Sequence, residues 1–523
     1  MKKIYNFTRS LTTKTLILVV VFLSLVLTAQ AQPTIEWQKC FGGIREDKAY
    51  CVELTTDGGY IIAGYTKSSD GNVTLNKGGF DCWVIKLFSN GNIEWQKTFG
   101  GSFDEEARAI KQTTDGGYIV VGYSCSNDGD VTGNHGGADY WILKLDASGN
   151  IEWQKSLGGT GTDKAYSVEQ TNDGGYIIVG YSYSSNGDLV GNYGFSDAWI
   201  IKLSADGNII LNKSFGGTED DVVFFIKKTT GNGYILGGAS FSNNIDLSEN
   251  HGYFDYWILK LDSVGNIIWN KSFGGSYVEE IQSIDQTTDG GYIVAGFSAS
   301  NTGEVVGNHG FFDYWILKLD SVGNIEWNKS FGGTEDDIAY SVQQTVDGEY
   351  IVVGQSSSVD GDLQFNHGLS DYWIIKLDTV GNIKWQKTYG GTDIEEAYSI
   401  KQTIDGGCIV VGCSRSADGD VSGNHGWYDY WIVKLSHLSF IDNKIKLFPN
   451  VQVYPNPFVD EIQISNSKNM HMDILLYDAM GRIIQKTMGI GSCLIKTGTI
   501  HSGIYFLRTN INNQGSTIIK VIK

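Results

Sequence analysis

The sequence predicts an all-β protein whose main body is a seven-bladed β-propeller of four-stranded blades. The first indication is a repeat of 58 residues that runs through most of the 523-residue chain. The second is the presence of four β-rich segments in each repeat, and the third is the way in which the two ends of the repeat array complement each other. Equal repeats of four antiparallel strands are typical of propellers. The repeat is visible at Trp37, Trp95, Trp153, Leu211, Trp269, Trp327 and Trp385.

The third repeat shows the expected order of strands. Residues 165–171 (AYSVEQT) are expected to form the first strand, and Asp173-Gly174-Gly175 turns it into the second, 176–182 (YIIVGYS). An Asp-Gly pair between two β-rich runs is a strong hairpin signal. A longer loop leads to the third strand, 197–203, and a glycine turn joins it to the fourth, 209–215. Both faces of these strands are apolar, which suits sheets packed between two neighbours.

The ends of the array predict how the ring closes. The last repeat stops after its third strand, 429–435, without the G-N-I-x-W sequence that opens a fourth strand elsewhere. A segment of that missing type, 35–41 (IEWQKCF), precedes the first repeat instead. Pairing of the two would complete a seventh sheet and leave no unpaired edge, whereas an open solenoid would need caps at both ends. We therefore expect residues 32–436 to form a closed propeller.

The N-terminus predicts a secretory signal peptide at residues 1–31. Basic residues precede a short apolar run, and Ala29-Gln30-Ala31 then gives a small-x-small pattern, which places cleavage between Ala31 and Gln32. The alternative is an uncleaved anchor, but the run is shorter than the ~20 apolar residues that a spanning helix needs. Export by the Sec route through the periplasm is expected, with no transmembrane segment in the mature protein.

Charge and cysteine usage narrow the function classes. The net charge of −20 argues against nucleic acid as a partner, because that interaction needs a basic face. The seven cysteines mostly stand where sister repeats carry other residues, as Cys82 does in place of Tyr140. We therefore expect neither a disulfide framework nor a metal-binding cysteine pair. The protein is also expected to be a monomer.

Beyond an irregular linker at 437–451, residues 452–523 form a separate β-rich region. It contains three motifs, namely Val453-Tyr454-Pro455-Asn456-Pro457-Phe458, Leu476-Tyr477-Asp478 with Gly481-Arg482, and Ser502-Gly503-Ile504-Tyr505-Phe506-Leu507. These motifs, in this order, resemble the type A C-terminal sorting domain of the type IX secretion system of Gram-negative bacteria. The resemblance implies an immunoglobulin-like β-sandwich that is recognised by the type IX secretion machinery at the outer membrane. It also implies cleavage in the linker and a location that is either secreted or on the outer-membrane cell surface.

The alternative for this region is an unrelated adhesive sandwich domain. The 58-residue units also resemble repeats of other exported bacterial and archaeal proteins, which carry W-x-K-x-(F/Y)-G-G, D-G-G-Y-I and D-Y-W. This second resemblance implies a fold and no particular activity.

The candidate metal ligands are aspartates of a recurring D-G-D sequence in the loop between the second and third strands. Their oxygens are the ligands that Ca²⁺ prefers, although D-G-D also forms turns in which Asp accepts backbone N–H bonds. Because no EF-hand or nonapeptide pattern accompanies them, we expect no resident cofactor and keep calcium as a hypothesis. The candidates are Asp128, Asp130, Asp360, Asp362, Asp418 and Asp420.

Other polar residues are expected to be structural. The histidines of the recurring Asn-His-Gly lie on different blades, so a shared metal site is not expected. Lys144, in a strand that is otherwise apolar, is expected either to extend its charged end toward water or to pair with a carboxylate such as Asp139. Arg45, Arg108 and Arg415 come from adjacent blades and suggest a sialidase-like arginine triad, but the blade number and the box spacing differ from that family.

Taken together, the sequence predicts an exported, non-enzymatic propeller that presents an acidic, aromatic-containing rim for binding protein or carbohydrate. No nucleophile–base set, cofactor loop or metal-spaced cluster emerges. A glycan-acting hydrolase and a structural surface-coat component are the alternatives. The fourth repeat diverges most, with Leu211 for tryptophan and Gly231-Asn232-Gly233 at the turn, and is the first place to look for asymmetry.

Overall fold

The computed structural model describes residues 32–247, 250–363, 365–436, 451–454, 460–466, 471–478, 483–490, 492–498, 504–511 and 516–522. Across these ranges the regular elements are all β-strands, and no helix is long and apolar enough to span a membrane. The predicted signal peptide with its cleavage residue Ala31, and the linker up to residue 450, lie outside the described residues.

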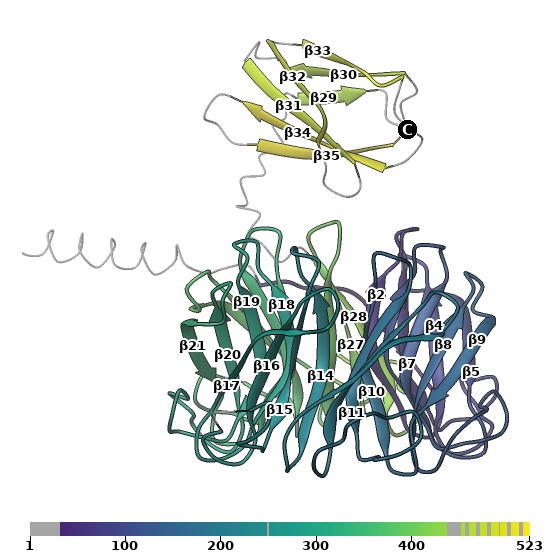
Figure 1. Cartoon of the computed structure of the whole chain (residues 1–523). Helices are drawn as coiled ribbons and strands as arrows, with labels where there is room; N and C mark the ends of the chain where they lie inside the picture. Colours follow the sequence, from purple (N-terminus) through teal and green to yellow (C-terminus); the bar gives the residue numbers. More distant parts are fainter. Residues whose placement is uncertain are drawn as a thin grey trace, which may run out of the picture. The chain divides into compact units, whose positions relative to one another are not determined.

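Residues Gln32–Thr403 and Cys408–Ser436 form one compact unit of seven four-stranded antiparallel sheets arranged around a central axis (Figure 1). The innermost strands are β2 (Asp47–Leu54), β6 (Glu105–Gln112), β10 (Asp163–Gln170), β14 (Asp221–Lys228), β18 (Glu279–Gln286), β22 (Asp337–Gln344) and β26 (Glu395–Gln402). The second strands are β3 (Tyr60–Thr66), β7 (Tyr118–Ser124), β11 (Tyr176–Ser182), β15 (Tyr234–Ser240), β19 (Tyr292–Ser298), β23 (Tyr350–Ser356) and β27 (Cys408–Ser414).

The outer half of each blade follows the same order. The third strands are β4 (Asp81–Leu87), β8 (Asp139–Leu145), β12 (Asp197–Leu203), β16 (Asp255–Leu261), β20 (Asp313–Leu319), β24 (Asp371–Leu377) and β28 (Asp429–Leu435). The outermost strands are β5 (Ile93–Phe99), β9 (Ile151–Leu157), β13 (Ile209–Phe215), β17 (Ile267–Phe273), β21 (Ile325–Phe331), β25 (Ile383–Tyr389) and, in the last blade, β1 (Ile35–Phe41).

Two faces of the propeller are named by their connections. The loop face carries the long loops from second to third strands and the connections from one blade to the next. The turn face carries the short turns from first to second and from third to fourth strands.

The N-terminal strand closes the ring as the sequence predicts. β1 pairs antiparallel with β28, and the last blade has the order β1-β28-β27-β26. Of the strands predicted in the third repeat, the second, third and fourth have the observed bounds. The first begins earlier than predicted, at Asp163, because the amide of this residue donates to the carbonyl of Ala138 and its backbone pairs with Ser182.

Five of the seven blade junctions are joined by the Tyr of one D-Y-W sequence and the equivalent Trp of the next blade. The Tyr140 ring lies 4.5 Å from that of Trp199 in the next blade, and the Tyr140 hydroxyl donates to the Trp199 carbonyl at 2.9 Å. The same bond joins Tyr430 to Trp83 across the closure at 3.0 Å. Each such hydrogen bond contributes about 1 kcal/mol, in addition to the burial of both rings.

Residues 451–522 contain the second group of strands. They are β29 (Val451–Tyr454), β30 (Glu461–Asn466), β31 (His471–Asp478), β32 (Ile483–Ile490), β33 (Ser492–Lys496), β34 (Ile504–Ile511) and β35 (Ser516–Ile522). Their order is β29-β30-β33-β32-β31-β34-β35, and β32 joins β33 through a single residue pair. Ile462 and Ile495, from β30 and β33, pack against Ile474 and Leu507, from β31 and β34. This packing of two layers fits the expected β-sandwich.

The closure generates a prediction. A chain that lacks residues 32–41 leaves the edge of β28 unpaired and exposes the apolar residues that β1 covers. We expect a loss of about 3 kcal/mol or more in stability, together with aggregation. Thermal unfolding and size-exclusion chromatography measure both effects, and a synthetic peptide of residues 32–41 should restore the monomer. A deleted chain that stays monomeric with an unchanged melting temperature would contradict closure by β1.

Candidate functional site

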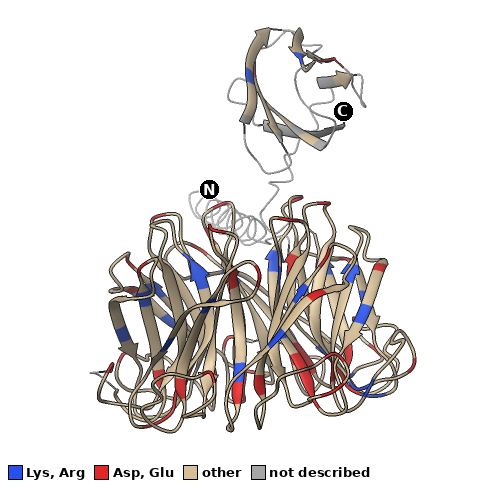
Figure 2. Ribbon diagram, turned by 45° about the vertical axis from the view of Figure 1, so that its right-hand side comes forward, with Lys and Arg blue, Asp and Glu red and all other residues tan. Residues whose placement is uncertain are grey.

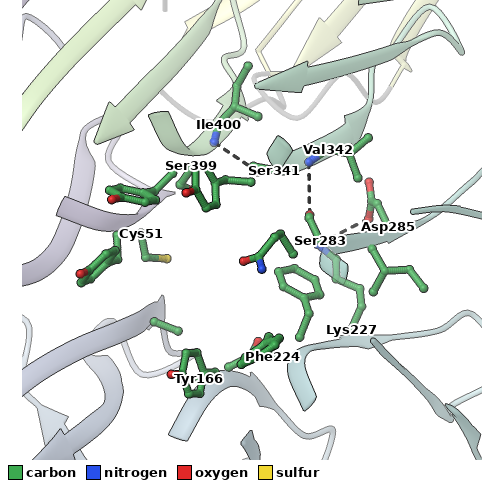
Figure 3. Close-up of a pocket in the computed structure, with 18 of the residues that line it drawn as sticks. Cys51, Tyr166, Phe224, Lys227, Ser283, Asp285, Ser341, Val342, Ser399 and Ile400 are labelled. Carbon is green, nitrogen blue, oxygen red and sulfur yellow. Dashed lines mark hydrogen bonds and ion pairs between the residues drawn. The ribbon is translucent and has the colours of Figure 1, made fainter. Parts of the chain in front are cut away.

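The seven innermost strands surround a cavity of about 200 Å³ on the propeller axis (Figure 3). Each strand is antiparallel to its blade neighbour and offers side chains to this channel at equivalent positions of the repeat. Because the repeats have equal lengths, equivalent residues from the seven blades form layers along the axis. The chemistry of the channel can therefore be described layer by layer.

The middle layer is mainly aromatic. Tyr166 lies 4.9 Å from Phe224, and Tyr398 lies 4.9 Å from Tyr340. The guanidinium of Arg108 lies over the rings of Tyr50 and Tyr166, at 4.1 and 5.3 Å from their centroids. Such cation–π contacts fix a charged group in an apolar environment. The layer is completed by Gln282, so its members are Tyr50, Arg108, Tyr166, Phe224, Gln282, Tyr340 and Tyr398.

The layer nearest the turn face is an ionic ring in which acidic and basic residues alternate. Its members, in blade order, are Glu53, Lys111, Glu169, Lys227, Asp285, Gln343 and Lys401. Lys111 binds Glu53 at 2.9 Å and Glu169 at 3.1 Å, and Lys401 binds Glu53 at 2.9 Å. Burial alone would raise the pKa of Glu53, but the two lysines lower it to about 2. The ring thus keeps Glu53 ionised.

The layer nearest the loop face is asymmetric. Lys48 binds Glu396 at 2.9 Å, whereas Glu280, two blades away from Glu396, receives a hydrogen bond from Gln282 at 2.6 Å. Burial raises the pKa of Glu280 to about 7, so this carboxyl changes charge near neutral pH. One part of the channel mouth is therefore an ion pair and another a protonatable acid.

The candidate calcium ligands contact backbone amides of the loop that leads from the preceding blade into their own blade. Asp128 Oδ1 accepts from Ser102 N at 2.8 Å, and Asp130 Oδ2 accepts from Gly100 N at 3.1 Å. The same two contacts recur in the other D-G-D loops, for Asp360 with Asp362 and Asp418 with Asp420. Among the described residues, no group of three or more His, Cys, Asp or Glu side chains is arranged to hold a metal ion. Calcium binding stays a hypothesis.

Several acids at the starts of the innermost strands are buried and do not contribute to an acidic rim. Asp221, Asp337 and Glu395 have no exposed surface and lie inside blade junctions, next to the aspartate that opens each third strand. Acidic residues are consequently found at the strand ends as well as in the loops (Figure 2). The sequence could not show this burial, because it depends on serines at the end of the following strand and on the aspartate of the neighbouring repeat, which are brought together only by the fold.

Lys144 pairs with carboxylates as expected, but Asp139 is not one of them. Lys144 binds Asp115 at 3.0 Å and Glu152 at 2.9 Å, both near the turn face. Asp139, at the other end of the same strand, accepts from His135 Nδ1 at 2.7 Å. The register of β8 separates the two residues, so the Asn-His-Gly histidine provides the basic partner of Asp139 in this blade.

The three arginines have different surroundings. Arg108 lies in the channel and binds Glu106 at 2.6 Å. Arg415 lies on the loop face, 3.5 Å from Asp393 and over the ring of Trp427, and Arg45 is exposed. Since the contacts of Arg108 and Arg415 are made in different places, the structure does not gather these residues into a triad.

The loop face carries a group of exposed apolar side chains that the sequence alone did not identify. Five consecutive blades place a large apolar side chain two residues before the third strand, and each is more than half exposed. An alignment of the repeats would have shown the difference between blades, because the first two blades carry Gly79 and Gly137 where the other five carry a large apolar residue. We call the five residues the rim arc: Phe195, Tyr253, Phe311, Leu369 and Trp427.

Fold and surface together define a β-propeller with a separate C-terminal export domain. Residues 452–523 match the family described as the secretion system C-terminal sorting domain, which confirms the resemblance to type IX sorting domains. This domain indicates secretion, with export to the outer membrane or the cell surface.

The other similarities are more distant. Regulatory protein FlaEY of Caulobacter vibrioides is 22% identical over 387 residues, which cover 64% of this chain and 39% of that protein. This chain therefore spans less than half the length of that relative. Among solved structures, a puromycin hydrolase is 11% identical with a TM-score of 0.40, covering 80% of this chain and 59% of that chain. An ancestral GH74 enzyme is 11% identical with a TM-score of 0.40, covering 93% and 63%.

The ionic ring generates a pH-dependent prediction for Glu53→Gln. Because the pKa of Glu53 is lowered in the folded protein, its carboxylate stabilises the fold above the unfolded pKa, and this contribution is lost as pH falls toward about 2. The substitution should cost about 2–3 kcal/mol at neutral pH and almost nothing near pH 2. Urea unfolding measures both values.

Glu152→Gln serves as the control for this experiment, because Glu152 forms a comparable ion pair but its side chain is 48% exposed. We expect it to cost less than about 1 kcal/mol at either pH. An equal effect of the two substitutions would contradict a special role for the ring.

Export generates a second prediction. Deletion of residues 451–523 removes the sorting domain, and we expect the propeller to accumulate in the periplasm instead of reaching the cell exterior. Fractionation and immunoblotting of the native host locate the protein, with the full-length chain as control. Normal surface export of the truncated chain would contradict the role of this domain.

Proposed function

We propose that this chain is a secreted or surface-exposed binding protein that recognises a protein partner with the loop face of its propeller. The rim arc is the observation that carries this proposal. Its side chains are 57–66% exposed and stand at one repeat position in five consecutive blades. Exposed apolar residues grouped in this way mark interaction sites, and aromatic side chains dominate the binding energy of protein interfaces.

The rim arc lies beside acidic residues. Glu335 is exposed, and Asp393 lies 3.5 Å from Arg415, whose guanidinium lies over the ring of Trp427. With a net charge of −20, the protein attracts basic surfaces from a distance and repels acidic ones. A partner with an apolar patch surrounded by Lys or Arg fits these two properties.

Backbone strain supports a function for the fourth blade. Ile245 has φ of +61°, a left-handed conformation in which the equivalent residues of the other six blades are glycines. A β-branched residue in this region costs about 1–3 kcal/mol, and such strain tends to persist at functional positions. The Ile245 side chain is 59% exposed on the same face as the rim arc.

The internal contacts of the channel favour binding over catalysis as the function of this chain. Glu53 and Arg108 are held in ion pairs, and Arg108 is held between aromatic rings as well. We infer that the chain leaves the cytoplasm by the Sec route, crosses the periplasm and uses the sorting domain for the last step. Cleavage at Ala31 and Gln32 belongs to this proposal.

The experiment compares rim and non-rim variants of the full-length protein. Phe311→Ala combined with Trp427→Ala should weaken binding to cell-envelope proteins tenfold or more. Protein binding is measured on the immobilised full-length protein, and glycan binding of the same variants is measured in parallel on a glycan array. Val346→Ala is the control, since Val346 is 89% exposed but belongs to the turn face.

Each outcome has a defined meaning. Rim-dependent binding to individual proteins supports the proposal. Rim-dependent binding to glycans alone would replace the protein partner by a carbohydrate, and binding that the rim variants leave unchanged would overturn the assignment of the site.

A further inference from the structure

Every junction between blades contains two carboxyl groups that are completely buried. One belongs to the aspartate that opens a third strand, and the other to the acid that opens the innermost strand of the next blade. The arrangement occurs seven times and includes the ring closure. The pairs are Asp81 with Glu105, Asp139 with Asp163, Asp197 with Asp221, Asp255 with Glu279, Asp313 with Asp337, Asp371 with Glu395, and Asp429 with Asp47.

The two carboxyls of a pair approach the same glycine. A methyl group on Gly216 would lie 2.5 Å from Asp197 Oδ1 and 2.9 Å from Asp221 Oδ2, so only glycine fits between them. The first aspartate of every pair has its Oδ1 buried without a hydrogen-bond partner. An ionised carboxylate with an unpartnered buried oxygen, facing a second carboxylate, is strongly disfavoured.

The second carboxyl of the pair is well satisfied as an acceptor. Asp221 Oδ2 accepts from Gly217 N at 2.6 Å and from the Ser242 hydroxyl at 2.7 Å, and Oδ1 accepts from the Ser240 hydroxyl. Asp197, in contrast, has one described partner, because its Oδ2 accepts from Tyr193 N at 2.7 Å. Donors thus surround Asp221, whereas Asp197 Oδ1 faces an acceptor.

We propose that the buried carboxyl pairs bind protons at neutral pH, with the proton carried on the unpartnered Oδ1 of the third-strand aspartate and directed at its partner carboxylate. The protonated group then supplies the one donor that the junction lacks. Protonation also removes the repulsion between two charges that are shielded from water.

The junction of the third and fourth blades is the clearest case. Other blades place His or Lys next to the third-strand aspartate, but Tyr193 stands at this position in the third blade. The charged groups that act on Asp197 among the described residues are both acidic, Asp221 and Asp246. Burial and these two acids raise the pKa of Asp197 to about 7, and burial also raises the pKa of Asp221.

The sign of the pH effect follows. A carboxyl whose pKa is raised by folding stabilises the protein below its unfolded pKa, and this contribution is lost as pH rises through the folded value. For Asp197 the loss extends from about pH 4 to about pH 7 and above. The ionic ring behaves in the opposite sense and loses its contribution at acidic pH, so the two effects are separable.

The decisive variant is Asp197→Asn in the full-length protein. Asparagine keeps an acceptor for Tyr193 N and offers a permanent N–H donor to Asp221, so it imitates the protonated state. We expect its melting temperature to exceed that of the unmodified protein by about 2 °C or more near pH 8.5, and to differ little near pH 5. Asp221→Asn places an amide among donors and should lower the melting temperature at both pH values.

Asp206→Asn is the control, because Asp206 lies in an exposed turn of the same blade and the hydrogen bond from the Ser204 hydroxyl lowers its pKa. It should give no stabilisation near pH 8.5. Infrared spectroscopy of the folded protein provides a measurement that does not depend on stability. A protonated-carboxyl band at neutral pH should weaken in Asp197→Asn and persist in Asp206→Asn.

Destabilisation by Asp197→Asn at both pH values would overturn the proposal, since it would mean that the junction needs two ionised groups. Absence of the infrared band at neutral pH would overturn it as well.

Discussion

Every sheet in this propeller has two apolar faces, and that constraint determines the rest of the structure. A sheet of this kind is stable only when a neighbour covers each face, and a chain of such sheets is satisfied only when the last meets the first. The Tyr140–Trp199 contact and its counterpart between Tyr430 and Trp83 show the same packing inside the array and across the closure. Ring formation is thus the condition for burying the core.

The surfaces available for function follow from this packing. Since both faces of each sheet are covered, variation between blades is tolerated mainly at the strand ends and along the axis. The rim arc lies at strand ends, and the channel layers lie along the axis. The divergent fourth blade fits this view, because its strained Ile245 belongs to a loop and its strands keep the common pattern.

The sequence predicted those features of the fold for which all the necessary residues lie within one repeat. Strand order and the Asp173-Gly174-Gly175 turn could be predicted, because turn residues and β-rich runs lie close together in the chain. Closure by residues 35–41 could be predicted for another reason, because the strand type missing from the last repeat stands before the first one. The partners of Lys144 and the burial of Asp221 could not, since they depend on strand register and on contacts with the next blade. The exposure of the rim arc likewise depends on how loops of successive blades are placed in space.

The number of blades restricts which residues can occupy the ionic ring. Opposite charges can alternate around a closed ring without a clash only if the number of positions is even, and here it is seven. Gln343 occupies the position between Asp285 and Lys401 where alternation fails, and it accepts a hydrogen bond from Gln402 N at 3.0 Å. The duplication or loss of one 58-residue unit would therefore change the parity of the ring. Loss of the unit that carries Gln343 would leave six alternating charges, whereas loss or duplication of any charged unit would leave unequal numbers of acidic and basic groups in the ring.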